Sequence, residues 1–259
     1  KLHGKPDQPK VVYAGKTKTD AMEQLMEHIP YLEQVYFAGG EPLIMEEHYI
    51  ILNELIKRKM TNVRLIYNTN LSRTAFKDSD AIEMWSHFKD VSVGASLDAS
   101  GERAELMRKG TEWTQTEKNR ERMLEIAPHV DFYISPTLNI FNSYHLPDFH
   151  KDWVRKGFLR PADLNVNILQ DPMWYRLDLL PQHMKDEITD KYERHIKWLT
   201  PRDPLTRAVN GFKSALTFMN SSDKSKFLPM FNKKVQELDK IREEKTSVVF
   251  PELQPILDA

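Results

Sequence analysis

Five short apolar runs alternate along the chain with stretches whose apolar residues recur at helical spacing, and this alternation limits the fold more than any other feature. Strands that alternate with helices pair in parallel through right-handed crossovers, as in a β/α barrel or an open doubly wound sheet. We predict an α/β fold in which an incomplete TIM-like β/α barrel of parallel strands precedes a helical C-terminal region. The strands are expected at residues 33–38, 62–67, 90–97, 131–138 and 164–169.

The helices between these strands are predicted from the same periodicity. After Asp20 apolar residues recur every three or four positions, and Pro30 ends that helix. Only helical patterns follow the last strand, so we divide the chain into a partial barrel at 1–175 and a helical extension at 176–259 that packs on it. The helices are expected near 20–29, 46–60, 79–88, 114–126, 146–156, 181–199, 203–219 and 223–243, with a polar loop at 98–113 and a possible short strand at 11–14.

A glycine pair follows the first of the five strands. Gly39 and Gly40 allow a tight turn and a close approach of the backbone to a ligand, and Pro42 suits the start of a helical turn. Taken alone, this is a strand–helix turn in which Glu41 caps nearby backbone groups. Both candidate architectures place ligands at the carboxyl ends of their strands. The candidate site therefore also includes the polar strand ends at 68–70, 96–98, 137–139 and 170–172.

Charge and composition exclude several classes of function. The 37 basic and 38 acidic side chains nearly cancel, so no overall charge favours nucleic acid or an anionic membrane. No apolar run approaches the length of a membrane span, and the first residues lack the apolar core of a signal peptide. We therefore expect a cytoplasmic location. The chain contains no cysteine, so it holds neither a disulfide nor a thiolate-bound metal.

The strand ends, in their order and spacing, resemble those of the radical SAM superfamily, and more narrowly the twitch-domain-containing radical SAM proteins. The resemblance begins near residue 21 and rests on Gly39-Gly40-Glu41-Pro42, Asn68-Thr69-Asn70, Ser96-Leu97-Asp98-Ala99-Ser100-Gly101-Glu102-Arg103, Arg108-Lys109-Gly110-Thr111 and Trp113. It implies binding of S-adenosylmethionine (AdoMet). The residues carried over to that site are Gly39, Gly40, Glu41, Asn70, Ser96, Asp98, Arg108 and Leu169.

The resemblance also implies a role for each group. Carbonyl oxygens of the glycine pair would face the ammonium of AdoMet, and Arg108 would pair with its carboxylate. Ser96 and Asp98 are suited to the ribose hydroxyls, Asn70 to either of these groups, and Leu169 with its neighbour to the adenine. As isolated residues these positions have plainer explanations, because serine and aspartate cap loops and an arginine in a charged run is usually solvated.

The absence of cysteine is the main departure from the family, whose [4Fe-4S] cluster is held by a Cys-x3-Cys-x2-Cys loop after its first strand. The strand at 33–38 corresponds to the second strand of the family, so we expect the first strand and the cysteine loop upstream of residue 1. A pseudo-enzyme without a cluster is the rival explanation.

In the intact protein the resemblance implies AdoMet, a [4Fe-4S] cluster, an external electron donor and a 5′-deoxyadenosyl radical acting on a peptide, nucleotide or small metabolite. The chain by itself is expected to bind AdoMet weakly and to be inactive.

Two other functions stay open at this stage. A non-catalytic barrel could serve as a binding or scaffolding module, and a cofactor-independent barrel hydrolase or lyase would need titratable side chains at several strand ends.

The nine histidines suggest no ligand set: His145 and His150 are poorly spaced for one helix face, while His183 and His195 are expected on a helix surface. The apolar stripe within 223–243 is predicted to be a packing surface.

Overall fold

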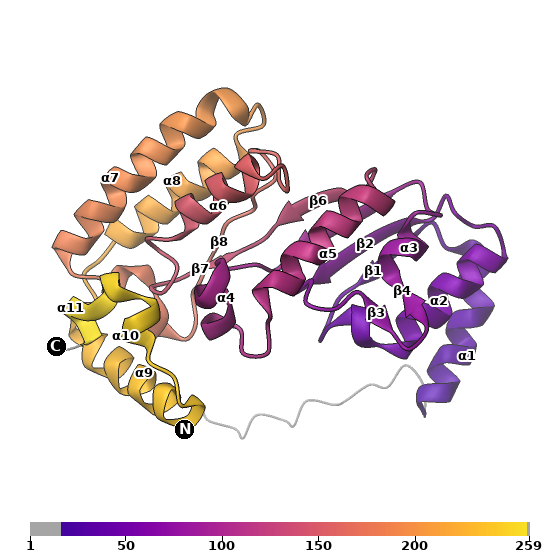
Figure 1. The fold of residues 1–259 in the computed structure, drawn as a ribbon, viewed down its shortest axis with the longest axis horizontal. Coiled ribbons are helices and arrows are strands. Elements are labelled where there is room, and N and C mark those ends of the chain that lie inside the picture. Colours follow the sequence, from indigo (N-terminus) through magenta and orange to yellow (C-terminus); the bar gives the residue numbers. More distant parts are fainter. Residues whose placement is uncertain (1–16, 258–259) are drawn as a thin grey trace, which may run out of the picture.

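A four-stranded parallel sheet forms the centre of the fold in the computed structural model, which describes residues 17–257 (Figure 1). Its strands run in the order β1, β2, β5, β6, and every neighbouring pair is parallel. The predicted parallel pairing is therefore confirmed. The strands are β1 (Gln34–Phe37), β2 (Arg64–Thr69), β5 (Val91–Ala95) and β6 (Asp131–Ile134).

The fourth predicted strand is broken, because Pro136 has no N–H to donate within a ladder. The chain re-forms a short strand, β7 (Thr137–Leu138), which pairs in parallel with β8 (Asn167–Ile168), and a single bridge joins Ile134 to Leu164. Within the described residues β1 pairs only with β2. The result is an α/β fold with an open parallel sheet, and closure into a barrel is not seen.

Helices cover the apolar face of the sheet, where Leu65 and Tyr67 are fully buried. On this side Tyr67 stacks on Phe37 and contacts Trp85, and its hydroxyl lies 3.0 Å from Nε2 of His48. The helices that precede or connect the strands are α1 (Lys18–His28), α2 (Glu46–Lys57), α3 (Ala81–Trp85), α5 (Trp113–Ile126) and α6 (Leu146–Arg155).

The opposite face of the sheet is polar. Asn68 donates to the hydroxyl of Tyr36 across 2.6 Å, and Tyr36 is 55% exposed. Tyr133 packs against Gly94, where a Cβ would come within 2.7 Å of its hydroxyl oxygen. A side chain at position 94 would therefore displace the end of the Tyr133 ring.

The C-terminal third is helical, as predicted, and Figure 1 shows α7 and α8 beside α6, with α9, α10 and α11 gathered near the C-terminus. Phe141, which follows β7, packs against Phe231 and Phe250 of this region. The division at residue 175 stays a prediction. The helices are α7 (Gln182–Leu199), α8 (Arg207–Asn220), α9 (Leu228–Arg242), α10 (Thr246–Val249) and α11 (Gln254–Leu257).

Several local predictions were wrong. The predicted polar loop contains a helix, α4 (Gly101–Met107). A small hairpin of β3 (Ala75–Phe76) and β4 (Ser79–Asp80) precedes α3, which therefore begins at residue 81 and not at residue 79. His195 is not a surface residue: it is 1% exposed, and its Nε2 lies 3.0 Å from Nδ1 of the equally buried His150. The possible strand at 11–14 lies outside the described residues.

Candidate ligand-binding edge and pocket

The glycine corner after β1 is open. Gly39 has φ +118°, a conformation that favours glycine, and a Cβ added at Gly39 or Gly40 would meet no atom within 4 Å. Both residues are exposed. A ligand can therefore approach this backbone closely.

Glu41 connects the ends of β1 and β2. Its Oε1 accepts from the Thr69 hydroxyl at 2.6 Å and from the Leu43 amide at 3.3 Å, and its Oε2 accepts from the Asn70 amide at 2.7 Å. The capping role that sequence alone suggested for this carboxylate is present. The Asn70 side chain has a local role as well, because its Oδ1 accepts from the amide and the hydroxyl of Ser72.

Asp98, predicted to bind a ribose, is paired with Arg108, predicted to bind a carboxylate. Its Oδ2 accepts from Nε of Arg108 at 2.7 Å, and its Oδ1 accepts from the Thr137 amide at 2.7 Å. Asp98 is 7% exposed, and Arg108 is the residue that caps the C-terminus of α4. Because the ion pair uses Nε, the terminal amino groups of the guanidinium lie outside it. Ser96 is half-buried next to this pair, and its amide donates to the Thr69 carbonyl.

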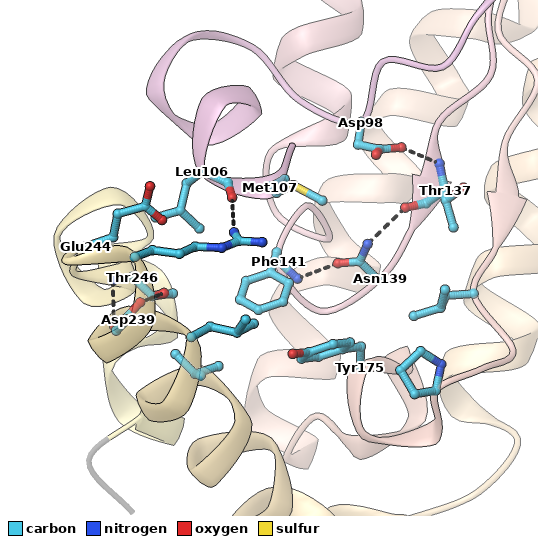
Figure 2. A pocket seen from close by; sticks show the side chains of 15 residues that line it. Asp98, Leu106, Met107, Thr137, Asn139, Phe141, Tyr175, Asp239, Glu244 and Thr246 are labelled. Carbon is cyan, nitrogen blue, oxygen red and sulfur yellow. Dashed lines mark hydrogen bonds between the residues drawn. The ribbon is translucent and has the colours of Figure 1, made fainter. Parts of the chain in front are cut away.

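A pocket of about 310 Å³ opens beside Asp98, between the loops after the strands and the helical C-terminal region (Figure 2). Asp98, Thr137 and Asn139 lie on one side and Asp239, Glu244 and Thr246 on the other, with Phe141 and Tyr175 between them. Of the eight predicted site residues, Asp98 and Leu169 line this pocket. The lining residues are Asp98, Leu106, Met107, Thr137, Asn139, Phe141, Leu169, Pro172, Tyr175, Val235, Leu238, Asp239, Arg242, Glu244 and Thr246.

Sequence reasoning missed the pocket's C-terminal wall. The stripe on α9 was predicted to be a packing surface, and Phe231 and Val235 are indeed buried. Val235 and Leu238, however, also face the pocket, while Ile241 is 78% exposed. No local motif marks such a wall, because it exists only where α9 folds back over the strand ends. Among the aromatic lining, burial is the main cause that raises the pKa of the Tyr175 hydroxyl.

A serine–histidine contact lies at the start of α4, where the hydroxyl of Ser100 is 2.8 Å from Nε2 of His145. Burial, and next the charge of Arg103, lowers the pKa of His145 to about 4, so the ring is neutral at pH 7. A nucleophile–base pair needs a third group that orients the base. Among the described residues no carboxylate is bonded to His145, and the contact ties the N-terminal ends of α4 and α6 together.

The side chains present do not fit an iron–sulfur cluster, because the sequence has no cysteine. Within residues 17–257 no group of three or more histidine, aspartate or glutamate side chains is arranged to hold a metal ion. The same residues include no helix that is long and apolar enough to cross a membrane.

Comparison with known proteins gives one kind of match. No family model matches the chain, and no curated protein matches it. Among solved structures, the chain resembles native anSMEcpe with bound AdoMet, with 18% identity and a TM-score of 0.49 over 76% of this chain and 56% of that one. It also resembles native anSMEcpe with bound AdoMet and the Cp18Cys peptide, with 17% identity and a TM-score of 0.48 over 71% and 50% of the two chains. The chain thus spans about half the length of these proteins.

Proposed function

We propose that this chain is the AdoMet-binding part of a radical SAM protein, with the cofactor lying along the carboxyl edge of the parallel sheet. The observation that carries the proposal is the placement of an open glycine corner after β1 and the Asp98–Arg108 pair after β5 on this one edge. Neighbouring strands are about 4.8 Å apart, so these two features lie about 10 Å apart across the sheet. An extended ligand with a polar group at each end suits that spacing.

Groups at this edge could make several of the contacts that the resemblance implies. The carbonyl groups of Gly39 and Gly40 would accept from the ammonium of AdoMet, and the terminal amino groups of Arg108 would pair with its carboxylate. Ser96 would bind a ribose hydroxyl, and Leu169 would contact the adenine. Asp98 already has a donor at each oxygen, so we assign it chiefly to holding the arginine in place.

These residues supply no ligand for an iron–sulfur cluster, because they include no thiolate. Any [4Fe-4S] cluster would need ligands from outside this sequence, and the proposed electron donor would act on that cluster. The substrate class, a peptide, nucleotide or small metabolite, is likewise not fixed by this edge, and the cytoplasmic location stays a prediction. The hydrolase alternative gains little support, because Glu41 and Asp98 are both engaged within the protein.

Titration of the chain with AdoMet, followed by ligand-observed NMR, tests the proposal. Valine at position 40 is tolerated by the fold, since its Cβ meets nothing within 4 Å, yet it would occupy the space where the ammonium lies. We expect Gly40→Val and Arg108→Gln each to weaken binding about tenfold, as the loss of a charge-assisted contact implies. Gly40→Ala should have an intermediate effect.

Arg155→Gln is the matched control, because Arg155 is a highly exposed arginine of α6 whose partner is the neighbouring Asp152. It should bind AdoMet as the parent chain does. The absence of AdoMet binding at millimolar ligand, or equal binding by all four variants, would refute the proposal.

A further inference from the structure

The pocket beside Asp98 is built by two parts of the chain that are distant in sequence. Leu169 and Tyr175 come from the region after the last strands, whereas Val235 and Leu238 come from α9. At about 310 Å³ the cavity reaches the lower end of the range typical of small-molecule sites. The C-terminal helices therefore supply one wall of a ligand-sized cavity at the carboxyl edge of the sheet.

The acidic side chains of this pocket are already engaged. Asp239 accepts from the Thr246 amide at 2.9 Å and from its hydroxyl at 2.6 Å. Glu244 forms an ion pair with Lys109, and the two Asp98 oxygens have the donors described above. A ligand that donates hydrogen bonds or carries a positive charge would have to share these acceptors.

Arg242 is the lining residue with spare hydrogen-bonding capacity. It donates from one terminal amino group to the Leu106 carbonyl at 3.0 Å, and within residues 17–257 no carboxylate lies within 4.0 Å of its guanidinium. A guanidinium carries five N–H donors in a planar fork that matches carboxylate and phosphate groups. Among the described residues, the half-buried guanidinium of Arg242 therefore has no paired anion.

The remainder of the lining is mostly apolar. Phe141 and Tyr175 lie 5.3 Å apart between ring centroids and form an aromatic surface, and Leu106, Met107 and Leu238 enclose it. Such a surface favours a flat or branched apolar body, which gains affinity by leaving water.

We infer that this pocket binds an amphipathic anion, with its apolar or aromatic body against Phe141 and Tyr175 and its carboxylate or phosphate paired with Arg242. The pocket adjoins Asp98 and Leu169, at the adenosine end of the proposed AdoMet site. The anion is therefore the substrate of that site. Its assignment as substrate rests on the proposed function, whereas its binding by Arg242 does not.

Three small probes test the chemistry on the full chain by saturation-transfer NMR. They are 3-phenylpropanoate, phenyl phosphate and the neutral 3-phenylpropanamide, which share a phenyl body and differ in the polar group. Both anions should bind more tightly than the amide by about fivefold or more, as a charge-assisted pair implies. The relative affinity of the first two probes identifies the anion as a carboxylate or a phosphate. Equal binding of the amide, or no binding of either anion, would overturn the inference.

Substitutions at two positions localise the binding. Arg242→Gln should reduce anion affinity about tenfold with little effect on the amide, and Arg242→Lys should restore part of it, since lysine keeps the charge but not the fork. Leu238→Trp fills the cavity and should reduce the binding of all three probes. Arg155→Gln is again the control, and thermal denaturation verifies that each variant is folded. Unchanged anion affinity in folded Arg242→Gln would contradict the assignment.

AdoMet titrations of the same variants separate the two proposals. Arg242→Gln should leave AdoMet affinity within about twofold, since its guanidinium is not assigned to the cofactor. Arg242-dependent probe binding without AdoMet binding would refute the proposed function and leave the anion pocket in place. AdoMet binding without probe binding would refute the pocket alone.

Discussion

Asp98 joins three segments of the chain, so its replacement tests the stability of the fold. Asp98→Ala removes the acceptor of the Thr137 amide and the partner of Arg108, both at a site that is almost fully buried. We expect a loss of about 1–3 kcal/mol in the free energy of unfolding, measured by urea denaturation. Asp131→Ala removes an exposed partner of Arg160 and should cost less than about 0.5 kcal/mol. Equal losses in the two variants would contradict this role for Asp98.

Gly211 gives a second test at the level of single residues. In an exposed helix interior, alanine is favoured over glycine by about 1 kcal/mol. On α8, however, a Cβ at this position would lie 2.9 Å from Cβ of Val166. We expect Gly211→Ala to destabilise the protein by about 1–3 kcal/mol in denaturant titrations, because overpacking outweighs propensity. The double variant Gly211→Ala/Val166→Gly, which removes the opposing Cβ, should recover part of that loss, and a stabilised single variant would exclude the close packing.

At the scale of elements, the hydrogen-bonded pair of His150 and His195 connects α6 to α7 inside the core. Burial lowers the pKa of both rings, with the His150 charge as a second cause for His195. Both are neutral in the folded state, while in the unfolded chain they titrate near pH 6.5. The unfolded state therefore takes up more protons below that pH. Stability is highest above about pH 6.5 and falls as the pH decreases towards the folded-state value, about 4 for His150.

Urea denaturation at pH 7.5 and at pH 5 measures this effect, which reaches about 2 kcal/mol per neutral buried histidine at pH 5. The variant His150→Leu/His195→Leu should lose less stability over this interval than the parent. Some dependence should remain, because burial also lowers the pKa values of His48 and His145 to about 4. If the free energy of unfolding falls by the same amount between pH 7.5 and pH 5 in the double variant as in the parent, the pair does not titrate on unfolding.

Some of the helices, strands and site residues could be predicted from the sequence, and others could not. Apolar periodicity located the strands of the central sheet and the long helices, because each buries a regular face. It missed α4, whose seven residues have Ala104 as the buried one, and it missed the break at Pro136, which depends on pairing with a distant strand. The strand-end residues were found from the general geometry of parallel sheets. Arg242 was not, because its importance depends on contacts that only the folded chain brings together.

At the scale of the whole molecule, the C-terminal helices are held against the strand-end loops by charge and by aromatic packing. Arg103 forms an ion pair with Glu252 and lies over the Phe250 ring, and Phe141 contacts the same ring. Deleting residues 228–259 would expose Phe141 and open the pocket to solvent. We expect the truncated chain to bind the dye ANS, to melt at a lower temperature and to lose the anionic probes. Retained probe binding would place the anion site elsewhere.

The order β1, β2, β5, β6 follows the order of synthesis, so each new strand can pair beside one that has already left the ribosome. The pocket is different, because α9 provides a wall only after residues 228–242 have also been made. Translation would then yield a protease-resistant sheet early and a binding-competent protein late. Nascent chains stalled after residue 175 should already protect β1 to β6 from proteolysis, whereas digestion throughout would show that the last helices are needed to hold the sheet.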